Sequence, residues 1–371
     1  MWRIENGQAV LVAYEIYRGP DGTIPSVPGL LPRCEFGLEI LIALAFQTQV
    51  LELSLDKVRA EQEFFWNLRL SKSQVDALLS RLAREWEHEF DVLCDLLLAS
   101  SVVRTDGTSW SLGSVSTFLS EHSRLMIFGC RQDAATLNVL LPKETFAGTI
   151  VSDDAAIYRG FAKAQKCWAH PLRKAIKLTL LAPNSRRYRE FKDGLLKLYH
   201  AALRAAADQR LGPQGRQRRV DELELQLCDL CRRRIADANL PPPGVERDFY
   251  NLVHELVRLM ADAELFTFVL DPSVPATNNE SERTLRSPAR QRRTDQTSRS
   301  LAGARRRTIL TSVLDSLRTQ LPRFNLHAVQ TEISRWFSTG KSCFARLAKK
   351  LKLPRSTCSY LDRLVPLPNS S

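Results

Sequence analysis

The segment between residues 101 and 153 constrains the fold of this chain more than any other part of the sequence. It contains four short runs rich in apolar and β-branched residues, which predict strands, and one short helical stretch that Pro142 ends. The last run is nearly all apolar, as expected of a buried strand. Strands are expected at Ser101–Asp106, Val115–Ser120, Arg124–Phe128 and Gly148–Asp153, and the helix at Asp133–Leu141. This order predicts an α/β core within a chain that is α+β overall.

Helical patterns dominate on both sides of that segment. Between residues 36 and 100, Ser71 and Gln74 have the spacing of a capping box, and apolar residues follow at 3.6-residue intervals. This apolar stripe comprises Val75, Leu78, Leu79, Leu82, Trp86, Phe90, Leu93 and Leu97. Further helices are expected from about 170 to 270 and from about 302 to 321.

Basic residues are concentrated in two stretches of the chain. The sequence has 53 Lys and Arg against 41 Asp and Glu, a net charge of +12. Residues 163–192 and 283–307 each hold nine Lys or Arg and one acid, so each carries +8 and the remainder about −4. A solvated helix face is the ordinary explanation for such runs. Because both stretches flank candidate carboxylates, we favour contact with a nucleic-acid backbone.

Other features of composition indicate a cytosolic protein. No segment approaches the roughly 20 apolar residues that a membrane span requires. The eight cysteines are too sparse for a secreted disulfide scaffold and are interpreted as reduced thiols.

Two aspartates follow predicted strands and are candidates for chemistry. Asp106 lies at the predicted end of one strand, before Gly107, and Asp153 lies at the end of another. If these strands are neighbours, the two carboxylates lie a few ångströms apart and repel each other unless a divalent cation sits between them. For either aspartate alone a cap or a surface charge is the competing explanation, and Asp154 could take the role of Asp153.

A third acid would complete a two-metal site, and Glu282 is the best candidate. Thr277 or Asn278 can cap a helix, which places Glu282 in its first turns. Arginines nearby suit a reaction at phosphate. Glu280, two residues away, is a rival, and a surface charge is again the competing explanation.

Three blocks of the sequence resemble the IS66 family of bacterial insertion-sequence transposases, over roughly residues 30–330. Thr105–Trp110 resembles the first-aspartate block. Ile150–Tyr158, followed by Cys167–Lys174, resembles the second-aspartate block and the strand after it. Asn278–Arg286 resembles the glutamate block, and a long helical stretch precedes it, as in the family. The family belongs to the DDE class, whose catalytic core is ribonuclease-H-like.

The resemblance implies a DDE triad of Asp106, Asp153 and Glu282, acting as catalytic residues and as metal ligands. Two Mg²⁺ ions, for which Mn²⁺ can substitute, would be the cofactor of strand cleavage at transposon ends and of strand transfer into target DNA. One ion would activate water or a 3′-hydroxyl, and the other would stabilise the leaving 3′-oxygen. Expected DNA contacts are Arg173, Lys174, Arg283, Arg286, Arg290, Arg292 and Arg293, and the expected supporting residues are Trp110, His170 and Asn279.

The resemblance also implies partners and a division of the chain. The partners would be transposon ends, target DNA, a second copy of the chain in the synaptic complex, and accessory proteins of the same element. The expected location is the bacterial cytoplasm, at the nucleoid.

The expected segments are an extended, poorly ordered arm with one short strand (1–35), a helical N-terminal region (36–100), the first part of the ribonuclease-H-like mixed-sheet core (101–170), a helical insertion (171–270), core helices with Glu282 (271–325) and a helical, basic tail (326–371).

Some positions depart from the family pattern and keep other hypotheses open. Gly107 stands where the family has an acid, and Asp154 stands where it has glycine. Relatives carry an N-terminal cysteine-rich element, whereas only Cys34 precedes residue 94 here, so recognition of ends would be weakened, lost or supplied by residues 36–100. The alternative to an enzyme is a catalytically inactive or truncated transposase-derived DNA-binding protein. A structural RNA-binding protein is a third hypothesis.

Two short motifs raise the question of zinc. Cys228 and Cys231 form a CxxC, and Cys167 and His170 form a CxxH, so the four could bind one ion. The CxxC lies in a predicted helix, however, where thiols at this spacing are usually incidental neighbours. His170 is otherwise expected to support the site or contact DNA, or to be a core histidine. For Trp110, core packing is expected and base stacking is the alternative.

Overall fold

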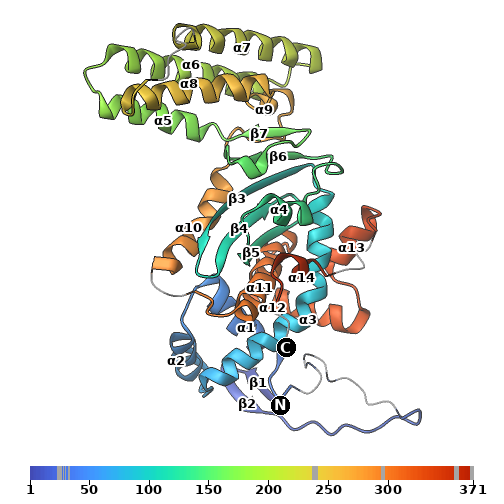
Figure 1. Cartoon of the computed structure of the whole chain (residues 1–371). Helices are drawn as coiled ribbons and strands as arrows, with labels where there is room; N and C mark the ends of the chain where they lie inside the picture. Colours follow the sequence, from blue (N-terminus) through green and yellow to red (C-terminus); the bar gives the residue numbers. More distant parts are fainter. Residues whose placement is uncertain are drawn as a thin grey trace.

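Five strands form a mixed sheet at the centre of the structure (Figure 1). The structure is a computed structural model. It describes residues 1–371 except 23–26, 28, 30, 32–33, 236–240, 294–296, 355–358 and 368–371. The strands are β3 (Val102–Trp110), β4 (Gly113–Leu119), β5 (Arg124–Cys130), β6 (Thr149–Ser152) and β7 (Ala164–Lys166), in the order β5-β4-β3-β6-β7. The first three pair antiparallel, and β6 and β7 run parallel to β3. An antiparallel meander extended by two parallel strands is the ribonuclease-H-like arrangement, so the predicted fold class is confirmed.

The elements predicted between residues 101 and 153 are all present, including the helix, which is α4 (Ala134–Leu140). Local pattern does not predict strand β7, because Gln165 and Lys166 interrupt any apolar run although both are buried. The family resemblance implies a strand at Cys167–Lys174, whereas β7 ends at Lys166 and a helix begins at Ala169. The long-range partners of Gln165 explain its burial: its side-chain amide donates to Leu265 O and accepts from Phe268 N. Polar residues can therefore occupy a buried strand here.

The position of Asp106 corrects one prediction. Asp106 lies inside β3 and not at its end, because β3 continues to Trp110 in antiparallel pairing with β4. Only the parallel pairing of β3 with β6 stops earlier, at Arg104 and Val151. The carboxylate therefore lies just beyond the end of that parallel pairing while its backbone remains held by β4.

The face of the sheet that carries Asp106 is covered by α10 (Asn279–Arg293). Side chains alternate along β3, so Val102, Asp106 and Trp110 share one face. Leu285 of α10 joins the buried cluster around Trp110 on that face. The predicted helix with Glu282 is therefore present and lies over the strand that carries Asp106.

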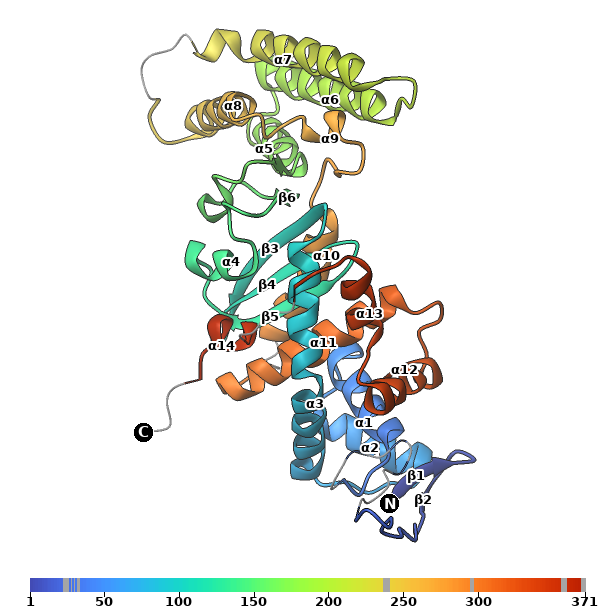
Figure 2. The same ribbon diagram turned by 90° about the vertical axis from the view of Figure 1, so that its right-hand side faces the viewer.

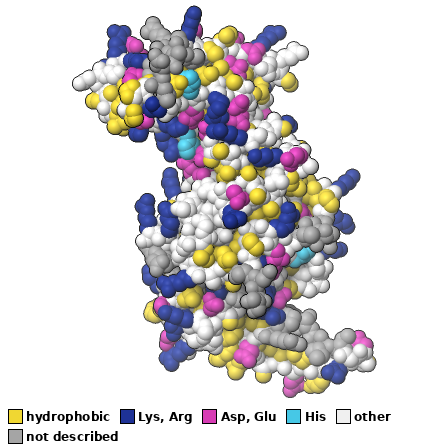
Figure 3. Space-filling view, in the orientation of Figure 1, with side chains coloured by type: hydrophobic (Ala, Val, Ile, Leu, Met, Phe, Trp, Pro, Cys, Tyr) yellow, Lys and Arg dark blue, Asp and Glu magenta, His cyan; other side chains and the backbone are white. Residues whose placement is uncertain are grey.

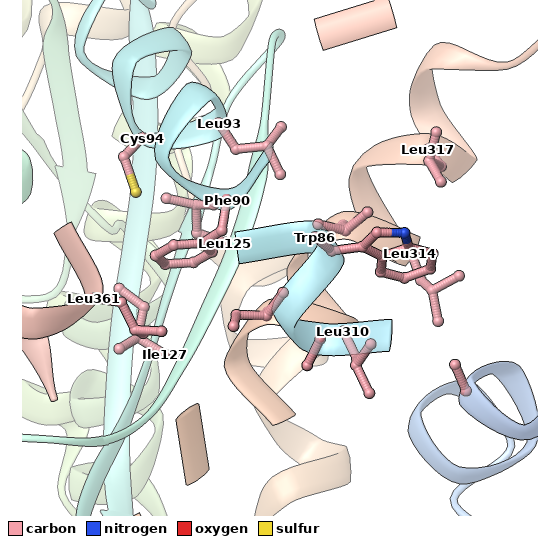
Figure 4. Packing of buried hydrophobic residues seen from close by; sticks show 14 of the residues in the cluster. Trp86, Phe90, Leu93, Cys94, Leu125, Ile127, Leu310, Leu314, Leu317 and Leu361 are labelled. Atoms are coloured by element: carbon pink, nitrogen blue, oxygen red, sulfur yellow. The ribbon is translucent and has the colours of Figure 1, made fainter. Parts of the chain in front are cut away.

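The main hydrophobic core lies on the opposite face. Figure 4 shows Trp86 and Phe90 of α3 (Lys72–Leu98) near Leu125 of β5 and Leu314 of α11 (Leu301–Gln320). All eight residues of the predicted stripe are buried, and Ser71 and Gln74 form the predicted capping box. The helix therefore begins where its cap predicts and buries the face that its periodicity predicts.

Helix α11 also closes the sheet at its β5 edge. Hydroxyls at four-residue intervals accept hydrogen bonds from alternate backbone amides of β5: Arg124 N to Ser316 Oγ (3.0 Å), Met126 N to Ser312 Oγ (3.0 Å) and Phe128 N to Thr308 Oγ1 (2.9 Å). The spacing places the hydroxyls on one helix face, and alternate amides of an edge strand point the same way. These backbone amides of the edge strand therefore have hydrogen-bond partners, and α11 blocks β5 from pairing with another chain.

The first 35 residues contain two strands rather than the one expected. β1 (Trp2–Glu5) and β2 (Gln8–Leu11) form an antiparallel hairpin whose turn is Asn6–Gly7, both with positive φ. Asn-Gly is the strongest short hairpin signal and could have been used to predict this turn. The helices α1 (Leu38–Ala45), η1 (a π-helix, Phe46–Val50) and α2 (Leu55–Trp66) follow. Pro25, Pro28 and Pro32 of the expected arm lie outside the described residues.

Five helices between β7 and α10 enclose a second hydrophobic cluster, at the top of Figures 1 and 2. They are α5 (Ala169–Leu181), α6 (Arg186–Ala207), α7 (Pro213–Ile235), α8 (Val245–Ala261) and α9 (Thr267–Leu270). The cluster reaches the sheet through Val102, Val151 and Trp168. These helices therefore pack on the face of the sheet that carries Asp106, over β3 and β6.

The last helices return to the main core. α12 (Leu326–Thr339), α13 (Cys343–Lys350) and α14 (Tyr360–Leu364) place Trp336, Phe344 and Leu361 in the same cluster as α3. A short 3₁₀-helix, η2 (Ala156–Tyr158), follows β6. Among the described residues no helix combines the length and the apolar character that crossing a bilayer demands.

Candidate active site

Asp106 and Asp153 lie at matching positions on neighbouring parallel strands. The pairing of β3 with β6 ends at Arg104 and Val151, and continuing the same register by two residues sets Asp106 beside Asp153. Adjacent strands are about 4.8 Å apart, and residues in register share one face. Backbone amides orient both side chains: Gly107 N donates to Asp106 Oδ1 (2.8 Å) and Ala155 N to Asp153 Oδ1 (3.1 Å).

The environment of Asp106 is that of a crowded carboxylate. Burial and the charges of Asp153 and Glu282, opposed by the Gly107 amide and Arg173, together raise the pKa of Asp106 to about 6. The other two acids predicted from the sequence therefore both act electrostatically on Asp106. A divalent cation would relieve this repulsion, so the donor set fits a hard, oxygen-preferring cation such as Mg²⁺.

Glu282 is held by two side chains from the first turns of α5. Its Oε1 lies 3.1 Å from His170 Nε2 and accepts from Arg173 Nη2 at 2.7 Å. His170 was expected near a strand end, and it lies three residues after Cys167, which follows β7. His170 and Arg173 thus both lie at the site, and both contact the glutamate.

Asn278 fixes the start of α10 relative to the sheet. Its Nδ2 donates to Thr105 O (2.7 Å), and its backbone amide donates to Cys167 Sγ (3.1 Å). Asn278 is buried, whereas Asn279, the residue expected to support the site, is exposed. The supporting contact predicted for Asn279 therefore belongs to Asn278, whose side chain reaches the strand and does not cap the helix.

Both rival acids are bound to arginines elsewhere. Glu280 accepts from Arg104 Nη1 (2.9 Å) and Arg124 Nη1 (2.6 Å), and these arginines lower its pKa against the opposing effect of burial. Asp154 is paired with Arg258 of α8. The two residues adjacent to the candidate acids therefore have structural partners of their own, which sequence reasoning could not identify.

A buried lysine, which sequence reasoning missed, anchors the segment around Asp153. Lys166 of β7 is 1% exposed. Its Nζ donates to Ser152 Oγ (3.2 Å) and Tyr158 O (3.1 Å), one residue before and five residues after Asp153, and lies 4.0 Å from Glu264 Oε1. Burial lowers the pKa of Lys166, partly offset by nearby acids. The only signal in the sequence was a lysine in a short run that leads into the CxxH.

Trp110 belongs to the core and not to the site. Its ring packs edge-on against Phe128 at 5.2 Å, and the Arg307 guanidinium lies 5.3 Å from the ring centre. Four residues of strand separate it from Asp106, about 13 Å. Its predicted role as a supporting residue is therefore wrong, and the competing expectation of core packing is correct.

The predicted DNA contacts divide into exposed and engaged side chains. Arg283, Arg286 and Arg293 are exposed on α10, and Figure 3 shows Lys and Arg side chains gathered over this helix, below the waist of the molecule. The engaged ones are Arg173 with Glu282, Lys174 with Glu255, Arg290 with Glu52, and Arg292 with Ser109. The exposed arginines of α10 therefore remain the best candidates for phosphate contact.

The rest of the second basic stretch, on α11, is structural. Arg305 pairs with Asp362 (2.6 Å), Arg306 pairs with Asp76 (2.6 Å), and Arg307 is half-buried against Trp110 and Phe128. In the first basic stretch, acids of α8 pair in the same way with bases of α5 and α6: Lys174 with Glu255, Lys177 with Asp248, and Arg187 with Glu246. Net charge along the sequence therefore overstates the DNA-facing charge.

One group of metal-binding side chains stands out among the described residues. Ligand atoms of Cys167, His170 and Glu282 all lie within 4.8 Å of one another, and within that part of the chain no other set of three or more does so. Neither Asp106 nor Asp153 belongs to this group, so the ligand atoms of the three candidate acids are not gathered within 4.8 Å of one another. Cys228 is exposed on α7 with its Sγ 3.7 Å from Met260 Sδ, so the four-ligand zinc site with Cys231 does not form.

The sheet order, the paired aspartate positions and the covering helix place this chain in the ribonuclease-H-like class of proteins. A comparison with known families agrees and is more specific. The family model described as "Transposase IS66 family" matches residues 36–306, most of the chain, so the protein belongs to the IS66 family of transposases. No curated protein matches the sequence.

Proposed function

We propose that this transposase cuts DNA at transposon ends and joins the cut ends to target DNA, with Asp106, Asp153 and Glu282 as the catalytic acids. The observation that carries the proposal is the register of β3 and β6, which sets the two aspartates side by side beneath the helix that bears Glu282. The acids stand on elements from three distant parts of the chain that pack against one rigid sheet, which supports a preorganised metal site.

Two divalent cations bound there would activate the attacking water or 3′-hydroxyl and stabilise the leaving 3′-oxygen. The chain's own residues supply position and charge. The Gly107 and Ala155 amides each occupy one oxygen of an aspartate. Glu282 would have to turn from Arg173 towards the aspartates, and the released guanidinium would then face the DNA phosphates.

We also propose how the remaining parts serve this reaction. Helices α5–α9 act as an insertion between β7 and α10, and they carry Arg173 and His170 to the site. The exposed arginines of α10 contact the DNA backbone. Two copies of the chain would bring two transposon ends together, as the family resemblance implies.

Conservative variants of the three acids test the proposal. Asp106→Asn, Asp153→Asn and Glu282→Gln should each lower Mg²⁺-dependent nicking of DNA carrying the element's ends by at least about 1,000-fold, because each removes a metal ligand. DNA affinity should stay the same or rise, since a negative charge is lost near the phosphates.

The neighbouring acids are matched controls for this experiment. Asp154→Asn and Glu280→Gln should keep nicking within about tenfold of the parent while lowering stability, because each removes an acid that pairs with arginines. If the triad variants nick normally, the chain is a DNA-binding protein without catalysis. If Asp154→Asn rather than Asp153→Asn abolishes nicking, the second acid is wrongly assigned.

A further inference from the structure

The thiol of Cys167 lies where the side chains that hold Glu282 converge, and the proposed DNA chemistry does not use it. Cys167 is 2% exposed and follows β7 directly. Its sulfur accepts hydrogen bonds from the backbone amides of Asn278 (3.1 Å) and Ala169. Burial raises the pKa of the Cys167 thiol and outweighs these two amides, which favour negative charge on the sulfur, so a bound cation has to displace the proton.

An imidazole and a carboxylate lie beside the Cys167 thiol. The reactive atoms of Cys167, His170 and Glu282 lie within 4.8 Å of one another. His170 Nε2 and Glu282 Oε1 are 3.1 Å apart. A tetrahedral zinc ion with bonds of about 2.0–2.1 Å to nitrogen and oxygen would hold these two atoms about 3.3 Å apart. The present separation therefore needs little adjustment to accept an ion.

The chemistry of these donors selects the kind of cation. Mg²⁺ and Ca²⁺ prefer sets made only of oxygen atoms, whereas sulfur, imidazole and one carboxylate suit a borderline-soft divalent ion. We propose that Cys167, His170 and Glu282 form a Zn²⁺ site with its fourth position open to water. On binding, the Cys167 thiol releases its proton to solvent as the zinc–sulfur bond forms, and the exposed Arg173 side chain leaves Oε1 of Glu282.

Glu282 belongs both to this zinc site and to the proposed catalytic acids, so the effect of Zn²⁺ on activity rests on the proposed function. Glu282 cannot bind Zn²⁺ beside α5 and at the same time serve a cation between the two aspartates. Zn²⁺ would therefore withdraw the third acid and inhibit a Mg²⁺-dependent reaction. Cys167→Ser should make the enzyme at least about tenfold less sensitive to Zn²⁺.

The site itself is tested by a spectrum and does not require activity. The Mg²⁺-free full-length protein is titrated with Co²⁺, which takes zinc sites and gives a thiolate-to-cobalt charge-transfer band when sulfur is a ligand. We expect saturation at one equivalent, and bleaching of the band when Zn²⁺ is added. Cys167→Ser should abolish the band, and His170→Gln should weaken Co²⁺ affinity at least about tenfold.

Matched variants separate this site from the other thiols and from the proposed function. Cys228→Ser, at an exposed cysteine on α7, should leave the titration unchanged. Asp106→Asn should keep the cobalt band while losing nicking, so failure of the DNA chemistry and failure of the zinc site are distinguishable. Absence of a saturable band, or a band that survives in Cys167→Ser, would overturn the proposal.

Discussion

Asp106 shows how a single residue can depend on what surrounds it. Its backbone is fixed inside a strand by β4, while its carboxylate lies beyond the pairing of β3 with β6, beside Asp153. Burial and the neighbouring acids raise its pKa to about 6. The metal-free protein therefore carries an electrostatic conflict at the position where the proposed function needs a cation.

That conflict predicts a pH dependence of stability. Because the folded pKa lies above the ordinary value, the folded chain holds a proton on Asp106 that the unfolded chain releases. The favourable contribution is complete below about pH 4 and is lost as the pH rises through about 6. In EDTA, Asp106→Asn should be more stable than the parent at pH 7.5 by about 1–2 kcal/mol, and no more stable at pH 4.

Asp133 provides a control of opposite sign. It caps α4 by accepting from Thr136 N, and that hydrogen bond lowers its pKa. Its contribution is present at neutral pH and is lost as the pH falls through its folded pKa, so Asp133→Ala should destabilise the protein more at pH 7 than at pH 3. Urea unfolding at each pH measures both effects. A pH-independent difference for Asp106→Asn would contradict the account.

At the scale of elements, the placement of α10 decides whether the three acids meet. Asn278 is the residue just before this helix, and it donates hydrogen bonds to Thr105 in β3 and to Cys167 after β7. The helix is thereby joined to β3 and to the segment after β7 through one buried residue, by its side chain and its backbone amide respectively. Glu282 lies one turn further along, so any shift of the helix start moves the glutamate.

We therefore expect Asn278→Ala to lower both stability and activity. Loss of the hydrogen bond to Thr105 should cost about 1–2 kcal/mol in unfolding free energy, and misplacement of Glu282 should lower nicking at least about tenfold. Asn279→Ala is the matched control, because Asn279 is exposed, and it should change stability by less than about 0.5 kcal/mol. Equal effects from the two variants would show that Asn278 does not position the helix.

The sequence predicted those elements whose own pattern determines them. The stripe of α3, its capping box and strand β6 follow from local periodicity and apolar content, and all are present. Local pattern does not predict strand β7, whose buried Gln165 and Lys166 have partners about 100 residues along the chain, Leu265 and Glu264. Only the family resemblance implies a strand near this position. The roles of Arg258 and Asn278 likewise depend on tertiary contacts. The sequence blocks predict the three candidate acids, whereas the side chains that contact these acids are identified only from the fold.

At the scale of the whole molecule, the basic stretches of the sequence do not correspond to equally basic surfaces of the folded protein. Lys174 and Lys177 of α5 and Arg187 of α6 pair with acids of α8. The arginines at the start of α11 pair with α3 and α14 or lie against aromatic rings. Exposed arginines remain on α10, beside the candidate acids (Figure 3). The DNA surface should therefore be narrower than the net charge of +12 implies.

This difference predicts distinct effects of neutralising two groups of arginines. Replacing Arg283, Arg286 and Arg293 together with Gln should reduce the slope of log K against log salt by about 2 to 3, because up to three phosphate contacts are lost. Replacing Arg305 and Arg306 with Gln should lower stability while leaving the slope nearly unchanged, since these side chains pair with Asp362 and Asp76. The reverse outcome would place the DNA surface on α11.

The central claim is that Asp106 and Asp153 hold a divalent cation between them. The most direct measurement is anomalous diffraction from crystals of the protein with Mn²⁺ and DNA ends. We predict a peak within about 2.2 Å of an oxygen of each aspartate, with Glu282 turned towards it, and its loss in Asp106→Asn. A fully occupied Mn²⁺ bound elsewhere, with the space between the two aspartates empty, would contradict the account.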